Sequence, residues 1–262
     1  MDSIDRLTPC LRPQDRVVMR QRWANLLFLH WEVDPAQLRP HLPPEIELDT
    51  FEGRAFIGLV PFTMTGVRPV WAPSVKPLSD FHETNVRTYV HRKGQDPGVW
   101  FFSLDAANSI AVMLARTLWR LPYHQADMSM KLDRSATISG SDEGLSVTYS
   151  TERLWPAPTP AHCKVSYSVC GAVNPAAAGT LEHFLAERYY LYAYKSAGAG
   201  KLYRGQVHHS SYPLQKADVA SLDETMIAAA GVERPLSGPG ATPLAHYASE
   251  VDVYIYALHR IV

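Results

Sequence analysis

The sequence predicts an α+β fold that consists of many strands and a few short helices. Short segments with alternating apolar and polar residues recur along the 262 residues, separated by turns rich in glycine, proline and aspartate. Tyrosine and tryptophan are frequent, which favours strands. Neither a βαβ alternation nor a glycine-rich phosphate-binding loop is found, so a Rossmann or P-loop nucleotide-binding fold is disfavoured.

Length and composition restrict the classes of protein that we consider. We expect residues 1–262 to form a single domain with a loose lead-in at about residues 1–13. The formal net charge of −1 gives no field that would attract nucleic acid or an anionic membrane. No apolar run is long enough to span a bilayer, and the first residues lack the features of a signal peptide. We therefore expect a cytoplasmic protein without nucleic-acid or membrane partners.

The first third of the chain contains a buried strand, a short helix and two further strands. The apolar run at residues 26–31 predicts the buried strand. Asp34, followed by a proline, predicts the cap of a helix over residues 36–41. Residues 45–49 and 54–64 alternate as strands around a turn at Gly53. The proline-rich residues 67–78 predict a loop that lines a cavity or covers it as a lid.

The middle of the chain predicts a strand pair followed by a helix. Residues 83–91 and 98–104 form the pair, and the turn sequence at residues 92–97 joins them. Asp105 is expected to cap a helix over residues 106–119. The apolar stripe of that helix would consist of Ile110, Met113, Leu114 and Leu118.

The remainder of the chain predicts further strands and two short helices. The strands are expected at residues 128–138, 145–152, 164–169 and 251–258, with a hairpin of residues 189–194 and 202–212. A helix is expected at residues 181–187, and Ser221 with Glu224 predicts a capping box for a last short helix.

Glu83, Asn85 and Arg87 are the first candidates for a functional site. Side chains alternate across a strand, so these three share one face. Burying a carboxylate, an amide and a guanidinium is costly unless they satisfy one another or a polar ligand. Arg87 suits a ligand carboxylate, because a guanidinium binds one with two parallel hydrogen bonds. An internal Glu83–Arg87 ion pair with a purely structural role is an equal alternative.

Several motifs resemble the acetoacetate decarboxylase-like proteins and, more closely, the YqjF-like family within that superfamily. They are ETNVRTYV at residues 83–90, VWFFSLD at 99–105 and LYRGQVHHSSY at 202–212, and the resemblance extends from about residue 22 to about residue 253. It implies a closed or partly closed antiparallel β-barrel of the acetoacetate decarboxylase-like type, with a few flanking helices and an internal polar pocket.

The same resemblance argues against covalent decarboxylation. The decarboxylases place two lysines after a tyrosine-proline pair, and one of them forms a Schiff base with the keto acid. The matching segment here is Leu121-Pro-Tyr-His124, so Tyr123 and His124 occupy the lysine positions. Only Lys131 or Lys164, entering from other strands, could restore that chemistry.

The other pocket residues of the decarboxylases are only partly retained. Glu83 matches one of their pocket glutamates, whereas a second would fall near Ile57 and is missing. Their pocket arginine has an ambiguous counterpart in Arg22.

Candidate roles follow for nine residues. Glu83 and His124 are candidate catalytic acids or bases, since histidine titrates near neutral pH, although an unreactive hydrogen-bonded loop histidine is favoured for His124. The candidate ligand-binding residues are Arg87, Asn85, Tyr123, Arg116, Arg204, Gln206 and His208. The last three share one strand face, which could equally be solvated surface, and Arg116 could be a surface residue. The sequence predicts no metal site and no cofactor.

Three functions remain open from the sequence. The first is binding of a small anionic or partly apolar ligand, such as an organic acid, without covalent catalysis. The second is a lyase, isomerase or hydrolase that acts on a keto or hydroxy acid through Glu83 or His124. The third is a scaffold, with possible homo-oligomer formation, whose pocket is vestigial.

Overall fold

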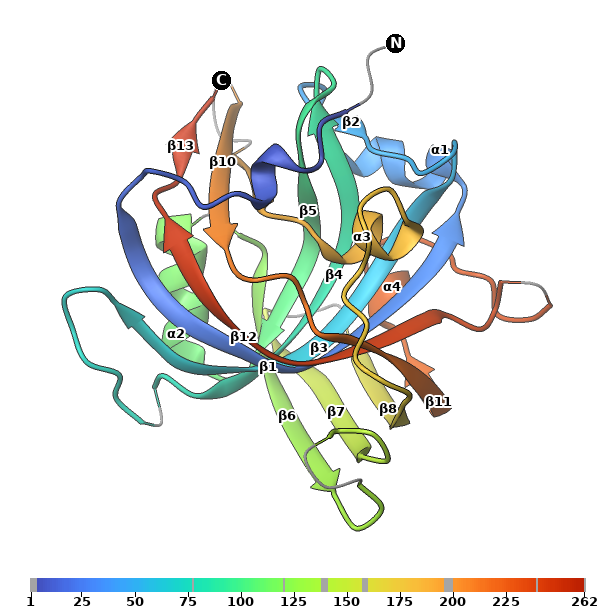
Figure 1. Cartoon of the computed structure of the whole chain (residues 1–262). Helices are drawn as coiled ribbons and strands as arrows, with labels where there is room; N and C mark the ends of the chain where they lie inside the picture. The colour runs from blue at the N-terminus through green and yellow to red at the C-terminus, as the bar shows by residue number, and fades with distance from the viewer. Residues whose placement is uncertain are drawn as a thin grey trace.

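The computed structural model describes residues 4–76, 78–119, 121–137, 141–156, 160–195, 200–238 and 240–261. In these residues the chain forms one large, strongly curved sheet with a few short helices at its edges, which confirms the predicted α+β class (Figure 1). The strands are β1 (Val17–Val33), β2 (Glu47–Leu48), β3 (Ala55–Pro69), β4 (Phe81–Arg92), β5 (Gln95–Ala106), β6 (Tyr123–Asp133), β7 (Ser146–Trp155), β8 (His162–Cys170), β9 (Tyr190–Lys195), β10 (Lys201–His208), β11 (Leu214–Glu224), β12 (Leu244–Tyr256) and β13 (His259–Arg260).

The helices are short and lie in the connections between strands. They are η1 (Thr8–Cys10), α1 (Pro35–Leu38), η2 (Arg39–His41), α2 (Ser109–Leu114), η3 (Ala115–Trp119), α3 (Leu181–Ala186) and α4 (Met226–Ala229). Asp34 caps α1 as predicted, since its side chain accepts a hydrogen bond from the backbone nitrogen of Ala36. Within the described part of the chain, no helix has the length and apolar character needed to cross a membrane.

Most strand pairs are antiparallel, and two pairings are parallel. The strand order is β13-β10-β9-β5-β6-β7-β8-β11-β12-β1-β3-β4-β2, with β5 parallel to both β6 and β9. Additional pairings join β10 to β12 and β4 to β5. The strands β12, β1, β3, β4, β5, β9 and β10 are therefore linked in succession and back to the start, and we call this set the seven-strand ring.

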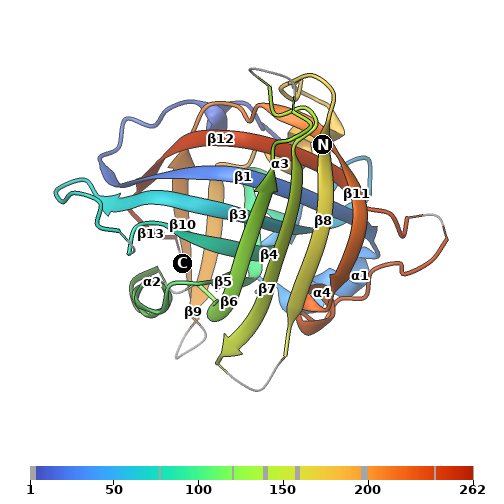
Figure 2. The same ribbon diagram turned by 90° about the horizontal axis from the view of Figure 1, so that it is seen from below.

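The two faces of β4 contact two different cores. Val86 packs in a core with residues of β1, β3, β7 and β8, and Thr84 hydrogen-bonds the hydroxyls of Tyr149 and Thr151 on β7 at 2.9 Å each. Figure 2 shows β6, β7 and β8 crossing the layer of β1, β3 and β12, which places this first core between the two layers.

The opposite face of β4 points into the seven-strand ring. On β3, Phe62 lies opposite Glu83 and Val60 lies opposite Asn85. Phe62 and Val60 belong to a second core that includes Phe28 of β1 and residues of β10 and β12. Because side chains alternate along β4, Glu83, Asn85 and Arg87 share this second environment.

The helix predicted over residues 106–119 is shorter than expected and has a different cap. Asp105 is buried at the end of β5, and Asn108 caps α2 by accepting from the backbone nitrogens of Ile110 and Ala111. The predicted stripe is also wrong for Ile110 and Met113, which are exposed. The side chains of Leu114 and Leu118 lie outside the described residues. Asp105 does not cap the helix because it forms an ion pair with Arg153. The sequence around Asp105 does not indicate this partner.

Three further predictions differ from the structure in detail. Strand β2 pairs with β4, whereas the sequence suggested a partner in residues 54–64. Strand β3 continues to Pro69, so the proline-rich loop begins later. Ser221 lies within β11, and no side chain caps α4 at its N-cap Thr225, although Glu224 does accept from the nitrogen of Ile227 at 3.1 Å. In each case a strand pairs with a segment that is distant in the sequence. The local structure that the sequence predicted there therefore does not form.

Candidate functional site

Three buried polar residues of β4 form the center of the candidate site. Glu83, Asn85 and Arg87 have exposed fractions of 2%, 5% and 8%. They lie at alternate positions on the face that points into the seven-strand ring. We call them the polar row.

Glu83, the first residue of the polar row, contacts Tyr123 at the start of β6. The hydroxyl of Tyr123 donates a hydrogen bond to Oε2 of Glu83 at 2.8 Å. Burial raises the pKa of Glu83 to about 8, and the charge of Asp105 raises it further, while hydrogen bonds from Tyr123 and Asn85 lower it. Burial, together with Glu83, also raises the pKa of Tyr123. Near neutral pH this pair therefore holds a proton on a carboxyl group that can release it.

Asn85 joins the two ends of the row. Its side chain lies close enough to the Glu83 carboxyl group to lower the pKa of that group. Its Oδ1 atom is buried and has no hydrogen-bond partner in the structure. An unsatisfied buried amide oxygen is costly, which indicates a position where a ligand donor would be favourable.

Arg87 is a buried cation without a carboxylate partner. Its guanidinium donates to the backbone oxygen of Leu185 at 3.2 Å, and its Nε has no partner. The guanidinium carbon lies 5.5 Å from the ring center of Phe28 and 5.9 Å from that of Tyr89. Among the ion pairs of the described residues, none involves Arg87, so the internal Glu83–Arg87 pair considered from the sequence is not formed.

The surroundings of Arg87 are histidines and tyrosines that stay neutral. Burial and the charge of Arg87 lower the pKa of His30, whose Nε2 lies 2.6 Å from the hydroxyl of Tyr89. Burial lowers the pKa of His209 to about 4, with a smaller contribution from Arg87. Burial raises the pKa of Tyr212, and the charges of Arg87 and of the buried Glu187 act on it in opposite directions.

Two more buried groups near the row lack partners. Nε2 of His209 and Nε1 of Trp23 are both unsatisfied, and their rings lie 5.7 Å apart. Sequence reasoning missed both residues. Alternation places His209 on the strand face opposite His208, and the small apolar residues Gly205 and Val207 on that face are the signal that it points inward.

Glycine at position 58 makes room for this arrangement. Gly58 pairs with His30 on β1 and with Arg87 on β4. A Cβ atom there would lie 3.0 Å from Cδ2 of the His30 ring and 3.5 Å from Cγ of Arg87. The absence of a side chain therefore allows the imidazole and the guanidinium chain to approach each other.

His124 lies on the other face of the sheet from Tyr123. It pairs with Asp105, whose carboxylate receives two hydrogen bonds from Arg153 at 2.7 and 2.8 Å. Burial lowers the pKa of His124 to about 4. Arg116 is exposed, donates to the backbone oxygen of Tyr123 and lies 5.3 Å from the ring of Trp155. The structure thus brings Tyr123 to Glu83 and places His124 and Arg116 elsewhere.

The three candidates on β10 have side chains on the face that points away from the interior of the seven-strand ring. Arg204 forms an ion pair with Asp96 and lies 4.5 Å from the ring of Tyr190. Arg204 and Gln206 line a small hollow of about 170 Å³. His208 stacks near Tyr254. These residues do not meet Arg87, which lies on the inward side of the sheet.

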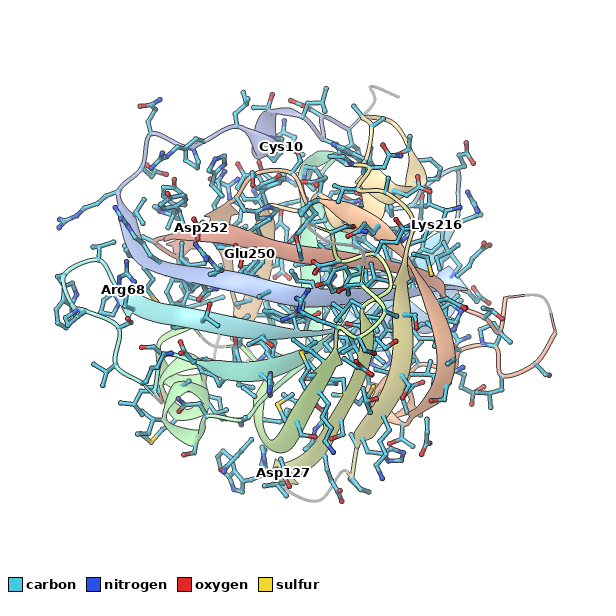
Figure 3. All side chains as sticks on the ribbon, turned by 60° about the horizontal axis from the view of Figure 1, so that its bottom comes forward. Cys10, Arg68, Asp127, Lys216, Glu250 and Asp252 are labelled. Atoms are coloured by element: carbon cyan, nitrogen blue, oxygen red, sulfur yellow. The ribbon has the colours of Figure 1, made fainter. Side chains whose placement is uncertain are left out.

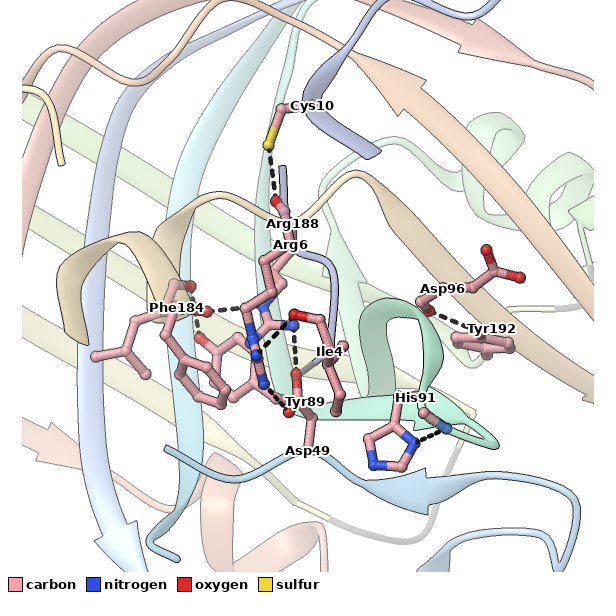
Figure 4. Close-up of polar contacts among 12 residues, drawn as sticks. Ile4, Arg6, Cys10, Asp49, Tyr89, His91, Asp96, Phe184, Arg188 and Tyr192 are labelled. Atoms are coloured by element: carbon pink, nitrogen blue, oxygen red, sulfur yellow. Dashed lines mark hydrogen bonds and ion pairs between the residues drawn. The ribbon is translucent and has the colours of Figure 1, made fainter. Parts of the chain in front are cut away.

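A larger hollow of about 570 Å³ lies between the N-terminal segment and α3. Arg6 and Arg188 both form ion pairs with the buried Asp49 beneath this segment (Figure 4). The segment expected to be a loose lead-in therefore contacts the body of the protein through Arg6. Helix α3 forms one wall of the hollow through Phe184, while the backbone oxygen of Leu185 faces Arg87.

Lys131, Lys164 and Arg22 lie at the surface. Lys131 and Lys164 are exposed, so neither enters the polar row. Arg22 forms an exposed ion pair with Asp252 and a second one with Glu250 on β12; both acidic residues are labelled in Figure 3. Within the described ranges, no cluster of three or more histidine, cysteine, aspartate or glutamate residues is arranged to hold a metal ion.

Comparison with known sequences identifies the family. The family model of an uncharacterised conserved protein, DUF2071, matches residues 20–252. The chain belongs to the DUF2071 family. It is 36% identical over 243 residues to the uncharacterised protein YqjF of Bacillus subtilis, covering 93% of this chain and 92% of YqjF. The resemblance to the YqjF-like proteins is therefore confirmed.

Solved structures share the fold of this DUF2071 protein at low sequence identity. An acetoacetate decarboxylase-like enzyme from Sphingomonas wittichii is 12% identical with a TM-score of 0.62, covering 94% of each chain. The enduracididine biosynthesis enzyme MppR, complexed with pyruvate, is 13% identical with a TM-score of 0.60 over 96% of this chain and 92% of its own. These similarities establish an acetoacetate decarboxylase-like fold.

Proposed function

We propose that this DUF2071 protein binds a small organic acid inside the seven-strand ring, which acts as a barrel around the ligand. The ligand carboxylate would lie at Arg87, and the rest of the molecule would extend toward Asn85 and Glu83. The observation that carries the proposal is the buried guanidinium of Arg87, which has no carboxylate partner and an unpaired Nε.

The energetics of Arg87 support an anionic ligand. A buried charge costs several kcal/mol unless a partner of opposite charge compensates it. Here the compensation consists of one backbone oxygen, two aromatic rings and the nearby hydroxyl of Tyr89. A ligand carboxylate would supply the missing charge and could accept from two nitrogens of the guanidinium. MppR, which shares the fold, has a structure in complex with pyruvate. A small organic acid as the ligand of this protein is consistent with that complex.

The chemistry at the former lysine positions supports binding without a Schiff base. Tyr123 occupies one of them and hydrogen-bonds Glu83, and a phenol cannot form an imine with a keto acid. Borohydride reduction in the presence of pyruvate is therefore expected to leave the mass of the intact protein unchanged. A stable adduct on any lysine would contradict this assignment.

A comparison of two arginine variants tests the binding proposal. Wild-type protein, Arg87→Met and Arg16→Met are screened by thermal shift and calorimetry against a panel of monocarboxylic acids. Arg16 is exposed at the start of the chain and controls for loss of one positive charge. We expect binding by wild type and Arg16→Met and its loss in Arg87→Met, since a ligand raises Tm only when it prefers the folded state. Binding that survives in Arg87→Met would contradict the proposal.

A second candidate function is acid–base catalysis on a keto or hydroxy acid. The pair of Glu83 and Tyr123 favours it, because a carboxyl group with a pKa of about 8 is suited to proton transfer near neutral pH. Such an enzyme would lose turnover in Glu83→Gln while still binding the acid. A protein that binds no acid and behaves identically after the Arg87 substitution would instead fit a scaffold role.

A further inference from the structure

Asn85 connects the proton-carrying end of the polar row to the cationic end. It shares one face of β4 with Glu83 and lowers the pKa of the Glu83 carboxyl group, and its Oδ1 is buried without a partner. An amide has one donor end and one acceptor end. Whichever end contacts Glu83, the other end is presented to a ligand.

We propose that Asn85 distinguishes a hydroxy acid from a keto acid, and that the protonation state of Glu83 determines whether the hydroxy acid is preferred. This inference rests on the proposed binding of an organic acid at Arg87. An ionised Glu83 only accepts hydrogen bonds, so Asn85 turns Nδ2 toward it and leaves Oδ1 for a ligand hydroxyl. A protonated Glu83 donates to Oδ1, so the amide flips and Nδ2 donates to a ligand carbonyl.

Tyr123 holds Glu83 in place in both states. Its hydroxyl donates to Oε2 at 2.8 Å, and a carboxyl group accepts there whether or not the other oxygen is protonated. The other oxygen, Oε1, remains for Asn85. Oε2 of Glu83 therefore keeps Tyr123 as its partner in both protonation states. The contact between Oε1 and Asn85 changes when Glu83 gains or loses its proton.

The groups around Glu83 keep this switch in the accessible pH range. Tyr123 of β6 and Asp105 of β5 act on its charge, and Phe62 of β3 lies opposite it. Tyr149 of β7 donates to its backbone oxygen at 3.1 Å. Arg87 lies four residues further along β4. Burial dominates and raises the pKa of Glu83 to about 8, so both protonation states can be sampled without denaturing the protein.

Matched ligands at two pH values test the inference. Calorimetry measures the Kd of 2-hydroxybutyrate and of 2-oxobutyrate at pH 6 and at pH 9.5, where both acids stay ionised and arginine stays charged. We expect the hydroxy acid to bind more tightly than the oxo acid at pH 9.5, because only a hydroxyl can donate to Oδ1, and we expect this preference to disappear at pH 6, where Nδ2 donates to a carbonyl or a hydroxyl oxygen. The ratio of the two Kd values should change by about tenfold or more, because the disfavoured ligand leaves a buried polar group unpaired.

The outcomes separate this inference from the proposed function. Binding of both acids with the same ratio at the two pH values overturns the switch and leaves the binding proposal standing. Failure of both acids to bind wild type at either pH contradicts the binding proposal and the switch with it.

Three variants sharpen the test. Glu83→Gln presents a permanent donor to Asn85, so it should show no preference for the hydroxy acid at either pH value. Glu47→Gln makes the same chemical change at an exposed position and should keep the pH-dependent preference. Tyr123→Phe removes a hydrogen bond that lowers the pKa of Glu83, so the pH at which the preference for the hydroxy acid appears should rise. If Glu83→Gln does not fold, an unchanged or lower pH for the onset of this preference in Tyr123→Phe overturns the inference.

Discussion

Glu83 should make stability depend on pH in a direction opposite to that of an ordinary carboxylate. Its pKa rises from 4.5 to about 8 on folding, mainly because burial disfavours the charged form. Between these values the folded protein holds a proton that the unfolded chain has released. The free energy of unfolding therefore falls as pH rises, by up to about 1.4 kcal/mol per pH unit from this residue.

Glu83→Gln tests that assignment, since glutamine has nearly the same shape and does not titrate. Urea unfolding of both proteins from pH 5 to pH 9 should show that the variant gains stability relative to wild type as pH rises. Parallel stability curves for the two proteins would mean that Glu83 has the same proton affinity in the folded and unfolded states.

Arg87 should cost stability in the ligand-free protein if it serves a ligand. Methionine matches much of its volume and removes a buried charge that has no counter-ion. We expect Arg87→Met to raise the free energy of unfolding of the empty protein by about 1 kcal/mol, measured by urea unfolding at pH 7. A loss of about 3 kcal/mol or more would instead show that the guanidinium is a structural element of the ring.

At the scale of elements, the ion pair of Asp105 and Arg153 joins β5 to β7 across β6. Both side chains are buried, with exposed fractions of 0% and 4%, and two hydrogen bonds connect them. Asp105→Asn would leave the Arg153 cation buried without its charge partner. We expect a loss of about 3 kcal/mol in the free energy of unfolding.

An exposed ion pair provides the control for this prediction. Asp252 on β12, labelled in Figure 3, pairs with Arg22 on β1. Both side chains are exposed. Asp252→Asn should change stability by less than about 1 kcal/mol, because water and salt screen such pairs. Urea unfolding measures the loss in the free energy of unfolding for Asp105→Asn and Asp252→Asn. Similar losses would contradict the prediction that the buried ion pair stabilises the protein more than the exposed one.

Alternation along single strands was the most reliable guide from the sequence. It placed Glu83, Asn85 and Arg87 on one face of β4, because the period of two holds whatever the strand pairs with. It also separated His208 from His209, but it could not say which face of β10 points inward. That choice depends on the pairing of β10 with β9 and β12.

Long-range partners were the part that the sequence could not supply. Asp105 has the sequence context of a helix cap, and only the position of Arg153, 48 residues away, shows that it forms a buried ion pair. The N-terminal segment likewise has no local signal for its contact between Arg6 and Asp49. Such contacts depend on the topology of the sheet, which local patterns do not determine.

At the scale of the whole molecule, β4 separates two interiors with different character. The core between the layers is mainly apolar, with buried hydroxyls at Thr84, Tyr149, Thr151 and Tyr167. The interior of the seven-strand ring holds the polar row and the unpaired atoms around Arg87. The fold thus places structural packing on one side of a strand and the candidate ligand site on the other.

This division predicts where a bound acid changes hydrogen exchange. An acid at Arg87 should slow exchange in β4, in β10 near His209 and in α3, whose Leu185 oxygen contacts the guanidinium. The strands β7 and β8 contact the other core and should be unaffected. Exchange measured with and without a bound monocarboxylic acid checks this, with Arg87→Met as the control that should show no change. Protection concentrated in β7 and β8 would place the ligand between the layers, and protection limited to the N-terminal segment and α3 would place it in the surface hollow.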